Sequence, residues 1–143
     1  MSAISSDVVI IGGGIMGSSA AFFLSRRGRS VTLLESGLIG QQASGTNFGN
    51  TRRQGRPLDQ LPLANRASEI WRHSKELLGT DVEYLESGHI RICYRDRPGT
   101  VGEFEDYARD ALLCGLELEI FTGTTLRKRF PFLGGDVLAA SYR

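Results

Sequence analysis

The sequence predicts an α/β protein in which a parallel β–α–β unit is followed by part of an α+β subdomain with an antiparallel sheet. The apolar run Val8–Ile11 ends in glycines, and a helical pattern and a second apolar run, Val31–Leu34, follow within about thirty residues. After residue 79, short segments alternate between apolar and polar residues, which is typical of antiparallel strands with one buried face. We therefore expect two domains, residues 1–79 and residues 80–143.

The turn after the first apolar run has the G-x-G-x-x-G spacing, at Gly12, Gly14 and Gly17. The first glycine permits a sharp turn, the second lets the backbone approach a pyrophosphate, and the third lets the helix pack closely on the strand. The first helical N–H groups, at Ile15 and Met16, carry the positive end of the helix dipole. The spacing therefore predicts a site for a dinucleotide.

An acidic residue, Glu35, stands at the end of the second apolar run. At the carboxyl end of that strand its carboxylate can accept hydrogen bonds from ribose hydroxyls, and it would repel a 2′-phosphate, which argues against NADP. A glycine turn in an α/β protein that binds no nucleotide is the alternative.

Residues 36–59 predict a long loop, because they are rich in Gly, Ser, Asn and Arg and have neither a strand nor a helix period. A loop of this length in a compact domain is usually functional or disordered. Since it leaves the strand that ends in Glu35, we expect its hydroxyl, amide and backbone N–H donors to contact the ligand. A mobile linker is the alternative.

Helices are expected at residues 15–27 and 60–78, with the first ended by Gly28 and the second by Gly79. Later in the chain, Thr100 and Glu103 have the spacing of a capping box before a helix. The other expected elements are a hairpin of residues 82–85 with 89–94, strands at 116–121 and 137–142, and a helix at 126–130 that Thr124 or Thr125 caps.

The composition is that of a globular protein: 41% of the 143 residues are hydrophobic and 23% are charged. A formal net charge of +1 gives no reason to expect nucleic acid as a partner. The two cysteines, Cys93 and Cys114, are far apart in the sequence and suggest neither a disulfide framework nor a metal cluster. We expect both to be small core residues, in a protein of a reducing compartment such as the cytoplasm.

No signal peptide is recognised at the N-terminus, and no apolar run approaches the length that spans a bilayer. This pattern leaves peripheral attachment to a membrane open. It also gives no indication of internal repeats.

These residues resemble the D-amino-acid-oxidase-like family of FAD-dependent oxidoreductases, which includes sarcosine and glycine oxidases, D-amino-acid dehydrogenases and hydrogen cyanide synthase subunits. The resemblance spans nearly the whole chain. It is carried by the fingerprint at residues 8–35, the loop at residues 43–56, the sequence Gly-His-Ile-Arg-Ile at residues 88–92, and residues 126–133 with Phe-Pro-Phe-Leu.

The resemblance implies that FAD is the cofactor and that a set of matching residues contacts it. Gly12, Gly14 and Gly17 would hold the pyrophosphate, and Glu35 the adenosine ribose. The full set of implied cofactor contacts is Gly12, Gly14, Ile15, Met16, Gly17, Glu35, Ser36, Ser44, Gly45, Thr46, Asn47 and Gly49.

Thr51 and Arg52 would lie near the reacting centre in a member of this family. A cation there could stabilise the anionic reduced flavin or hold a substrate carboxylate. A solvated loop is the alternative for Arg52, Arg53 and Arg56. The implied reaction is hydride transfer from the carbon beside an amine to the flavin, with a small amino acid or amine as substrate, and the resulting imine is then hydrolysed.

One departure from the family pattern is length, since its members are considerably longer and complete their sheet and substrate pocket with later segments. We therefore expect this chain by itself to bind FAD weakly and to turn over no substrate, as a fragment, a truncated frame or one part of a split protein that needs a partner subunit. Two other readings are open: an NAD-dependent dehydrogenase, which the long loop after Glu35 disfavours, and a non-catalytic module. Oxidase and dehydrogenase are not separated by this sequence.

Overall fold

The computed structural model describes residues 5–97 and 99–143. The chain forms two compact units, one ending at Asn50 and the other beginning at Thr51. This division follows contacts within the chain. The functional domains predicted at residues 1–79 and 80–143 stay a prediction.

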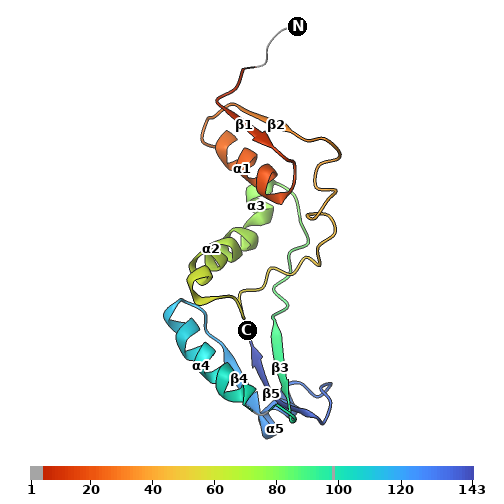
Figure 1. Ribbon diagram of the computed structural model, residues 1–143, viewed down its shortest axis with the longest axis vertical. Helices are drawn as coiled ribbons and strands as arrows, with labels where there is room; N and C mark the ends of the chain where they lie inside the picture. Colours follow the sequence, from red (N-terminus) through yellow and green to blue (C-terminus); the bar gives the residue numbers. More distant parts are fainter. Residues whose placement is uncertain (1–4, 98) are drawn as a thin grey trace. The chain divides into compact units, whose positions relative to one another are not determined.

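The first unit is a parallel β–α–β arrangement, as the sequence predicts (Figure 1). Strand β1 (Val8–Ile11) pairs with β2 (Val31–Leu34) in parallel, and helix α1 (Ile15–Ser25) connects them. The helix ends before Arg27 because the chain turns at Gly28, whose φ of 75° suits a glycine. The glycine turn, the acidic strand end and the helix start therefore lie at one end of a short sheet.

The apolar strands of this unit are only half covered. Exposure alternates along β1, and the side chains of Val9 and Ile11 are 57% and 87% exposed. Leu34 at the end of β2 is 53% exposed. The reason is geometric: successive side chains of a strand point to opposite faces, and within this unit one helix packs against the pair.

The second unit combines a three-stranded antiparallel sheet with helices. Its strands β3 (Ile90–Tyr94), β5 (Val137–Tyr142) and β4 (Glu119–Thr122) lie in that spatial order, so the last strand is central. The other elements are η1 (Leu58–Gln60), α2 (Leu61–Arg72), α3 (Ser74–Leu78), α4 (Thr100–Leu113) and α5 (Gly123–Arg129).

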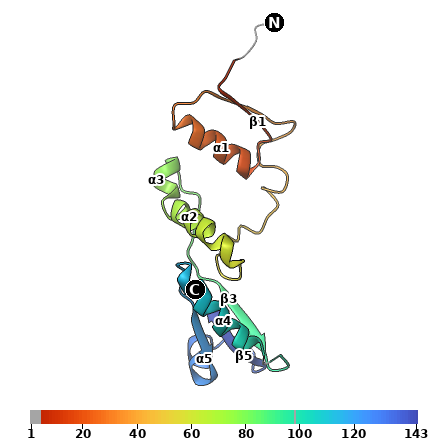
Figure 2. The same cartoon turned by 60° about the vertical axis from the view of Figure 1, so that its left-hand side comes forward.

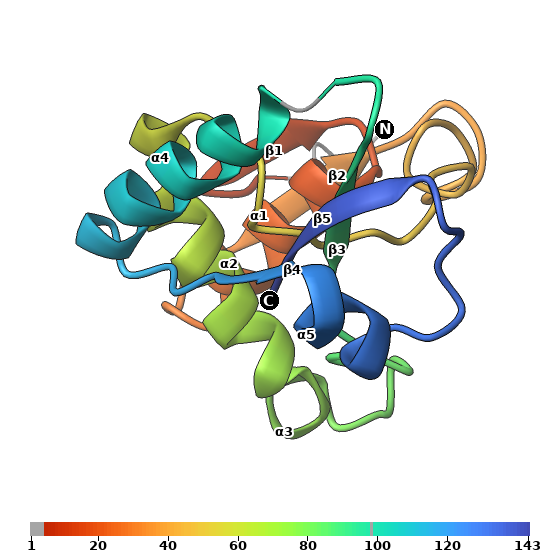
Figure 3. The same cartoon turned by 90° about the horizontal axis from the view of Figure 1, so that it is seen from below.

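Helices α5 and α4 cover the two faces of this sheet (Figures 2 and 3). On one face Leu126 and Phe130 pack against Val137 and Ala140. On the other face Phe104 of α4 packs against Cys93 and Ala139. A third apolar cluster joins Leu61 of α2 to Ala111 and Leu116 at the end of α4. The α+β subdomain predicted for this region is confirmed.

The hairpin predicted for residues 82–85 and 89–94 is wrong. Strand β3 pairs with β5 instead, with Arg91 opposite Ser141 and Cys93 opposite Ala139. The side chains that precede β3 pack on α2: the Tyr84 ring stacks on the Trp71 ring at 5.9 Å between centroids. Residues 82–86 thus lie against α2 outside any strand, and Glu83 among them has a positive φ of 57°.

The expected helix at residues 60–78 is two helices that meet at His73. The His73 imidazole Nδ1 lies 3.0 Å from the Glu69 carbonyl oxygen, an acceptor that the backbone N–H of His73 uses in a continuous helix. Competition for this carbonyl accounts for the break.

Two capping predictions are wrong as well. Helix α4 includes Thr100 and has Gly99 at its N-cap, and the Glu103 N–H donates to the Gly99 carbonyl at 3.4 Å. Helix α5 begins at Gly123 with Thr122 at its N-cap, and Thr125 Oγ1 donates to the Thr122 carbonyl at 2.7 Å. In both cases the helix begins earlier than the hydroxyl pattern indicates.

The strand expected to begin at Leu116 begins at Glu119 instead, as β4. Leu116 is fully buried against Leu61 and Ala111, and its N–H donates to the Ala111 carbonyl at 2.9 Å. This residue therefore closes the end of α4. The prediction that the cysteines are core residues is confirmed for Cys93, which is buried, whereas Cys114 is half-buried at the edge of an apolar cluster.

Within residues 5–97 and 99–143, no helix has the length and apolar character to cross a membrane. The same residues contain no group of three or more His, Cys, Asp or Glu side chains placed to hold a metal ion.

Leu126 provides a test of the second unit's core. It is 1% exposed, and truncation to alanine removes its contacts with Phe130 and Val137. We expect Leu126→Ala to lower the free energy of unfolding by about 2–5 kcal/mol. Leu63→Ala is the control, because Leu63 is 75% exposed, and it should change stability by less than about 0.5 kcal/mol. Urea unfolding followed by circular dichroism and Trp71 fluorescence measures both, and equal effects would contradict this core.

Candidate functional site

The turn between β1 and α1 has a geometry that requires glycine at its first position. Gly12 has a φ of 103°, a conformation that residues other than glycine rarely adopt. Its N–H donates to the Leu34 carbonyl of β2 at 2.8 Å. The chain can therefore leave β1 sharply while it stays bonded to the neighbouring strand.

Helix α1 approaches this turn so closely that Gly17 must also lack a side chain. A Cβ on Gly17 would lie 1.9 Å from the Gly12 carbonyl oxygen and 3.1 Å from its carbonyl carbon. These are backbone atoms, so they cannot rotate away as a side chain would. The role predicted for Gly17, close packing of the helix on the strand, is confirmed.

Glu35 is bonded directly to the glycine turn. Its Oε2 accepts from the Gly13 N–H at 2.7 Å, and its Oε1 accepts from the Gly37 N–H at 2.9 Å and from the Ser36 hydroxyl at 3.4 Å. Donation by these groups to the ionised carboxylate holds the pKa of Glu35 below its ordinary value of 4.5, with the Gly13 bond as the largest cause. The carboxylate is thus ionised at neutral pH, and its two oxygens have further acceptor capacity for hydroxyl groups.

The start of helix α1 presents its backbone donors beside a serine hydroxyl. Gly14 occupies the N-cap position, and the Ile15 N–H donates to Ser44 Oγ at 2.9 Å. A Cβ on Gly14 would lie 3.0 Å from the same oxygen, so a side chain there would have to displace the Ser44 hydroxyl. Ser44 therefore lies at the helix terminus where an anion is favoured, and its hydroxyl can donate to such a group.

The loop after Glu35 returns to the glycine turn and then folds on itself. The Gly40 N–H donates to the Gly13 carbonyl at 3.0 Å, which holds the start of the loop beside the turn. Farther along, Asn47 bridges two backbone groups: its amide nitrogen donates to the Ser44 carbonyl, and its oxygen accepts from the Gly49 N–H at 2.7 Å. The loop is thus an ordered part of the first unit up to this point.

The other loop residues of the predicted site lie close to Ser44. The Gly45 N–H and the Thr46 hydroxyl both donate to the Gln42 carbonyl, at 2.9 Å and 3.3 Å. A Cβ on Gly45 would lie 2.5 Å from the Gly40 carbonyl oxygen, so the turn needs a glycine there. Met16, in the first turn of α1, has a side chain that is 82% exposed. Cofactor contact by these residues stays a prediction.

The structure adds Gly13 to the group that the sequence singles out. This buried glycine donates to Glu35, accepts from Gly40 and also accepts from the Ser18 hydroxyl at 3.2 Å. The motif treats it as a variable position, so spacing alone passes over it. The run of three consecutive glycines is the signal that could have identified it.

Thr51 and Arg52, the residues predicted near the reacting centre, belong to the second unit. Arg52 Nη1 donates to the Gln54 carbonyl at 2.7 Å, and the Arg56 Nε donates to the Arg52 carbonyl at 2.9 Å. We call residues 51–56 the arginine segment. These hydrogen bonds join its residues, while Arg52 itself is exposed, so the solvated-loop alternative remains for Arg52.

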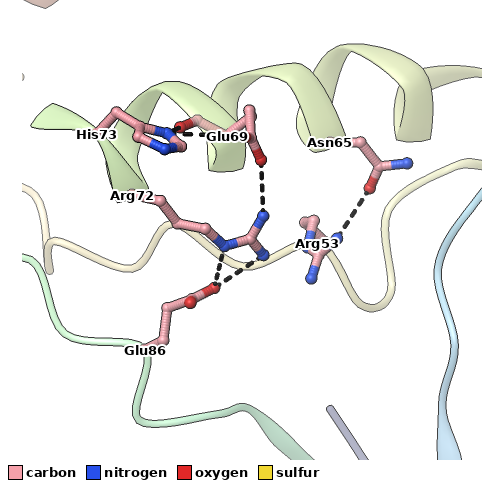
Figure 4. A network of polar contacts seen from close by, with 6 residues as sticks. All are labelled: Arg53, Asn65, Glu69, Arg72, His73 and Glu86. Atoms are coloured by element: carbon pink, nitrogen blue, oxygen red, sulfur yellow. Dashed lines mark hydrogen bonds and ion pairs between the residues drawn. The ribbon is translucent and has the colours of Figure 1, made fainter.

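A polar network next to this segment connects it with helix α2 (Figure 4). Arg53 Nη1 donates to Asn65 Oδ1 at 3.2 Å. Arg72 lies between two carboxylates, 3.0 Å from Glu69 and 2.9 Å from Glu86. The Arg72 guanidinium holds the pKa of Glu86 below its ordinary value of 4.5, chiefly through their hydrogen bond. These contacts tie both the arginine segment and the chain before β3 to α2.

The first-unit residues satisfy the chemical requirements of a dinucleotide. A bare backbone at Gly14 and Gly17, helix N–H groups beside a hydroxyl, and an ionised carboxylate bonded to the turn are the features that hold a pyrophosphate and a ribose. An ionised Glu35 at this position would also repel a 2′-phosphate.

Comparison with known proteins places these features in context. The sequence matches the family described as FAD dependent oxidoreductase over residues 7–142. It is 26% identical over 129 residues to monomeric sarcosine oxidase from Arthrobacter sp.. The aligned region covers 87% of this chain and 32% of that protein.

Two solved structures have the same fold as this chain. L-proline dehydrogenase from P. horikoshii matches with a TM-score of 0.85 and 26% identity, over 97% of this chain and 36% of the other. Glycine oxidase from Bacillus cereus matches with a TM-score of 0.75 and 31% identity, over 96% and 38% respectively. The chain thus spans about a third of the length of the relatives it matches.

Gly17 gives the sharpest test of the turn. We expect Gly17→Ala to destabilise the first unit by roughly 1–3 kcal/mol or more, because the new methyl group meets backbone atoms that cannot move aside. Gly37→Ala is a matched control in the same unit, since the nearest side-chain atoms to its Cβ are 3.9 Å away. Hydrogen exchange of the β1 amides measures the effect, and equal protection in both variants would refute the close approach.

Glu35 makes the turn sensitive to acid. A carboxylate whose pKa is lowered by folding stabilises the fold above its unfolded pKa, and this contribution is lost as the pH falls through the folded value. A ¹³C NMR titration of the Glu35 carboxyl should have a midpoint below 4.5 in the folded chain and a higher one in denaturant. Coincident midpoints would show that the bonds to Gly13 and Gly37 do not persist in solution.

Proposed function

This chain belongs to the family of FAD-dependent oxidoreductases, and we propose that it binds the adenosine diphosphate half of FAD through its first unit. The single observation that carries the proposal is the bond from Gly13 to the ionised Glu35, because it places the ribose-binding acid beside the phosphate-binding turn.

Each residue around the turn has a defined task in this proposal. The Gly14 backbone would face the pyrophosphate, and the Ser44 hydroxyl, which accepts from the Ile15 N–H, would donate to it. Glu35 accepts from the ribose hydroxyls. The remaining contacts, by Met16, Ser36, Gly45, Thr46, Asn47 and Gly49, follow from the family resemblance and from their place on the same turn and loop.

We propose further that the complete enzyme oxidises a carbon–nitrogen bond of a small amino acid or amine. Support comes from the relatives, which are named for sarcosine, glycine and L-proline. FAD, when bound, supplies the hydride acceptor for this chemistry. The chain's own contribution is to orient the cofactor and to supply charge near it.

Arg52 is the residue we assign to that charge, with Thr51 next to it in the sequence. A guanidinium is a permanent cation with several donors, so it can stabilise negative charge on a reduced flavin or hold a carboxylate. The bonds from Arg52 to the Gln54 carbonyl and from Arg56 to the Arg52 carbonyl support a defined position for this side chain.

We also propose that the protein works in a reducing compartment such as the cytoplasm. Its two free thiols, Cys93 and Cys114, support this.

The cofactor assignment is tested by titrating the chain with FAD and following the flavin absorbance. Glu35→Ala should weaken binding about tenfold or more, because hydrogen bonds to a charged group are lost. Glu117→Ala is the control, since Glu117 is an exposed carboxylate of the second unit. Equal affinities in the two variants, or no bound FAD at excess cofactor, would overturn the proposal.

The reaction class is tested separately with the holoprotein purified from its natural source. Anaerobic addition of sarcosine, glycine or proline should bleach the oxidised flavin if an amine carbon donates the hydride. A flavin that none of these compounds reduces, and that a simple alcohol does reduce, would contradict the assignment.

A further inference from the structure

The side chain of Gln54 is the most deeply buried polar group of the arginine segment, at 1% exposed. Its Nε2 donates to the Ser141 carbonyl at 3.1 Å and to the Ser141 hydroxyl at 2.6 Å. Its Oε1 lies 3.2 Å from His89 Nδ1. One amide therefore joins three parts of the chain that are distant in sequence.

The chemistry of these partners determines which atoms donate. The Ser141 carbonyl can only accept, so the nitrogen of the Gln54 amide must face it and the amide oxygen must face His89. His89 Nδ1 consequently carries a proton and donates to Gln54. Both ends of the buried amide are thus satisfied, which its burial requires.

The two partners lie at neighbouring ends of two paired strands, the central strand β5 and the edge strand β3. Ser141 belongs to β5, and His89 immediately precedes β3 and exchanges backbone hydrogen bonds with Arg143, at 2.9 Å and 3.2 Å. This part of the sheet is paired on both sides. Gln54 therefore anchors the arginine segment to a rigid part of the second unit.

Arg52 depends on this anchor for its position. Its Nη1 donates to the backbone carbonyl of Gln54 itself, at 2.7 Å. Tyr107 of α4 holds the next two residues: its hydroxyl accepts from the Gly55 N–H at 3.1 Å and donates to the Arg56 carbonyl at 2.8 Å. The segment is thus fixed to the sheet by Gln54 and to α4 by Tyr107.

A second guanidinium lies beside Arg52. A Cβ on Gly55 would be 3.2 Å from Arg52 Nη1 and 3.3 Å from Arg91 Nη1, so both groups converge on this bare position, where φ is 74°. Arg91 also stacks on the Phe104 ring at 5.2 Å. Holding two like charges near one backbone position is unfavourable unless the surroundings keep them there.

We propose that Gln54 is the positioning residue for Arg52: its buried amide locks the arginine segment onto β5 and His89 and so holds the Arg52 guanidinium beside that of Arg91. A neutral amide does this without adding a negative charge that would compensate the two cations. The catalytic meaning of the position rests on the proposed function of Arg52, whereas the positioning itself is a property of the second unit.

The side-chain Nε–Hε signals of arginine in ¹⁵N NMR test the proposal in the wild-type chain and in Gln54→Met. Met fills the same space without hydrogen bonds. We expect the Arg52 and Arg56 signals to move to their positions in the urea-unfolded chain, and exchange of the Arg56 Nε–H with solvent to become at least tenfold faster. The Arg72 signal should stay in place, because its bond to Glu86 is independent of Gln54. Arg→Lys variants assign the three signals.

Gln60→Met is the matched control, because Gln60 is an exposed glutamine of the same unit and should alter none of these signals. Gln54→Glu adds a spectroscopic reading: a carboxylate beside His89 should raise the titration midpoint of that imidazole by at least one pH unit. If Gln54 only fills space, the Arg52 signal stays at its wild-type position in both Gln54 variants, and the proposal is overturned.

Ser141→Ala provides a milder variant should Gln54→Met also shift the Arg72 signal through unfolding. It removes the bond of 2.6 Å and keeps the one of 3.1 Å to the carbonyl. It should broaden or shift the Arg52 signal with Arg72 unchanged, and an unchanged Arg52 signal would overturn the proposal. These measurements need no FAD, so failure of the FAD titration overturns only the proposed function, and an unmoved Arg52 signal overturns only this inference.

Discussion

The contact between helix α1 and the backbone of the turn before it is the constraint on which the first unit depends. Gly17 faces the Gly12 carbonyl at a distance that no side chain would permit. This approach directs the start of the helix, and with it the N–H groups at Gly14 and Ile15, toward the end of the sheet. Because β1 and β2 run in parallel, that same end receives Glu35. Close packing of the helix and the proposed phosphate recognition thus have one cause.

Glu35 has two tasks in this arrangement. Its bonds to Gly13 and Gly37 stabilise the turn, and in the proposed function its remaining acceptor capacity serves the ribose. In that proposal the same carboxylate organises the site before any cofactor arrives. A preorganised acceptor of this kind reduces the ordering that binding would otherwise require.

In the second unit a buried side-chain amide, that of Gln54, holds the arginine segment in place, whereas the first unit depends on glycines. Gln54 lies in a segment without regular secondary structure, so its backbone groups need partners from elsewhere. Arg52 Nη1 donates to the Gln54 carbonyl, and the Tyr107 hydroxyl bonds the Gly55 N–H and the Arg56 carbonyl. Ser141 and His89 hold the side-chain amide of Gln54. The network gives the arginine segment a single position, and in the proposed function that position carries the charge of Arg52.

Local patterns by themselves determined the β–α–β unit, its glycine turn and its acid, because strand, turn and helix there follow one another directly and one motif encodes their packing. Tertiary structure alone decided the partner of β3 and the burial of Gln54. Both depend on groups remote in sequence: β5 lies more than forty residues beyond β3, and the Gln54 amide bonds a serine 87 positions away. The break at His73 is local, but it depends on competition for one carbonyl that the apolar pattern does not show. Alternation shows that a strand has two faces, but it contains no information on which other strand will satisfy its hydrogen bonds.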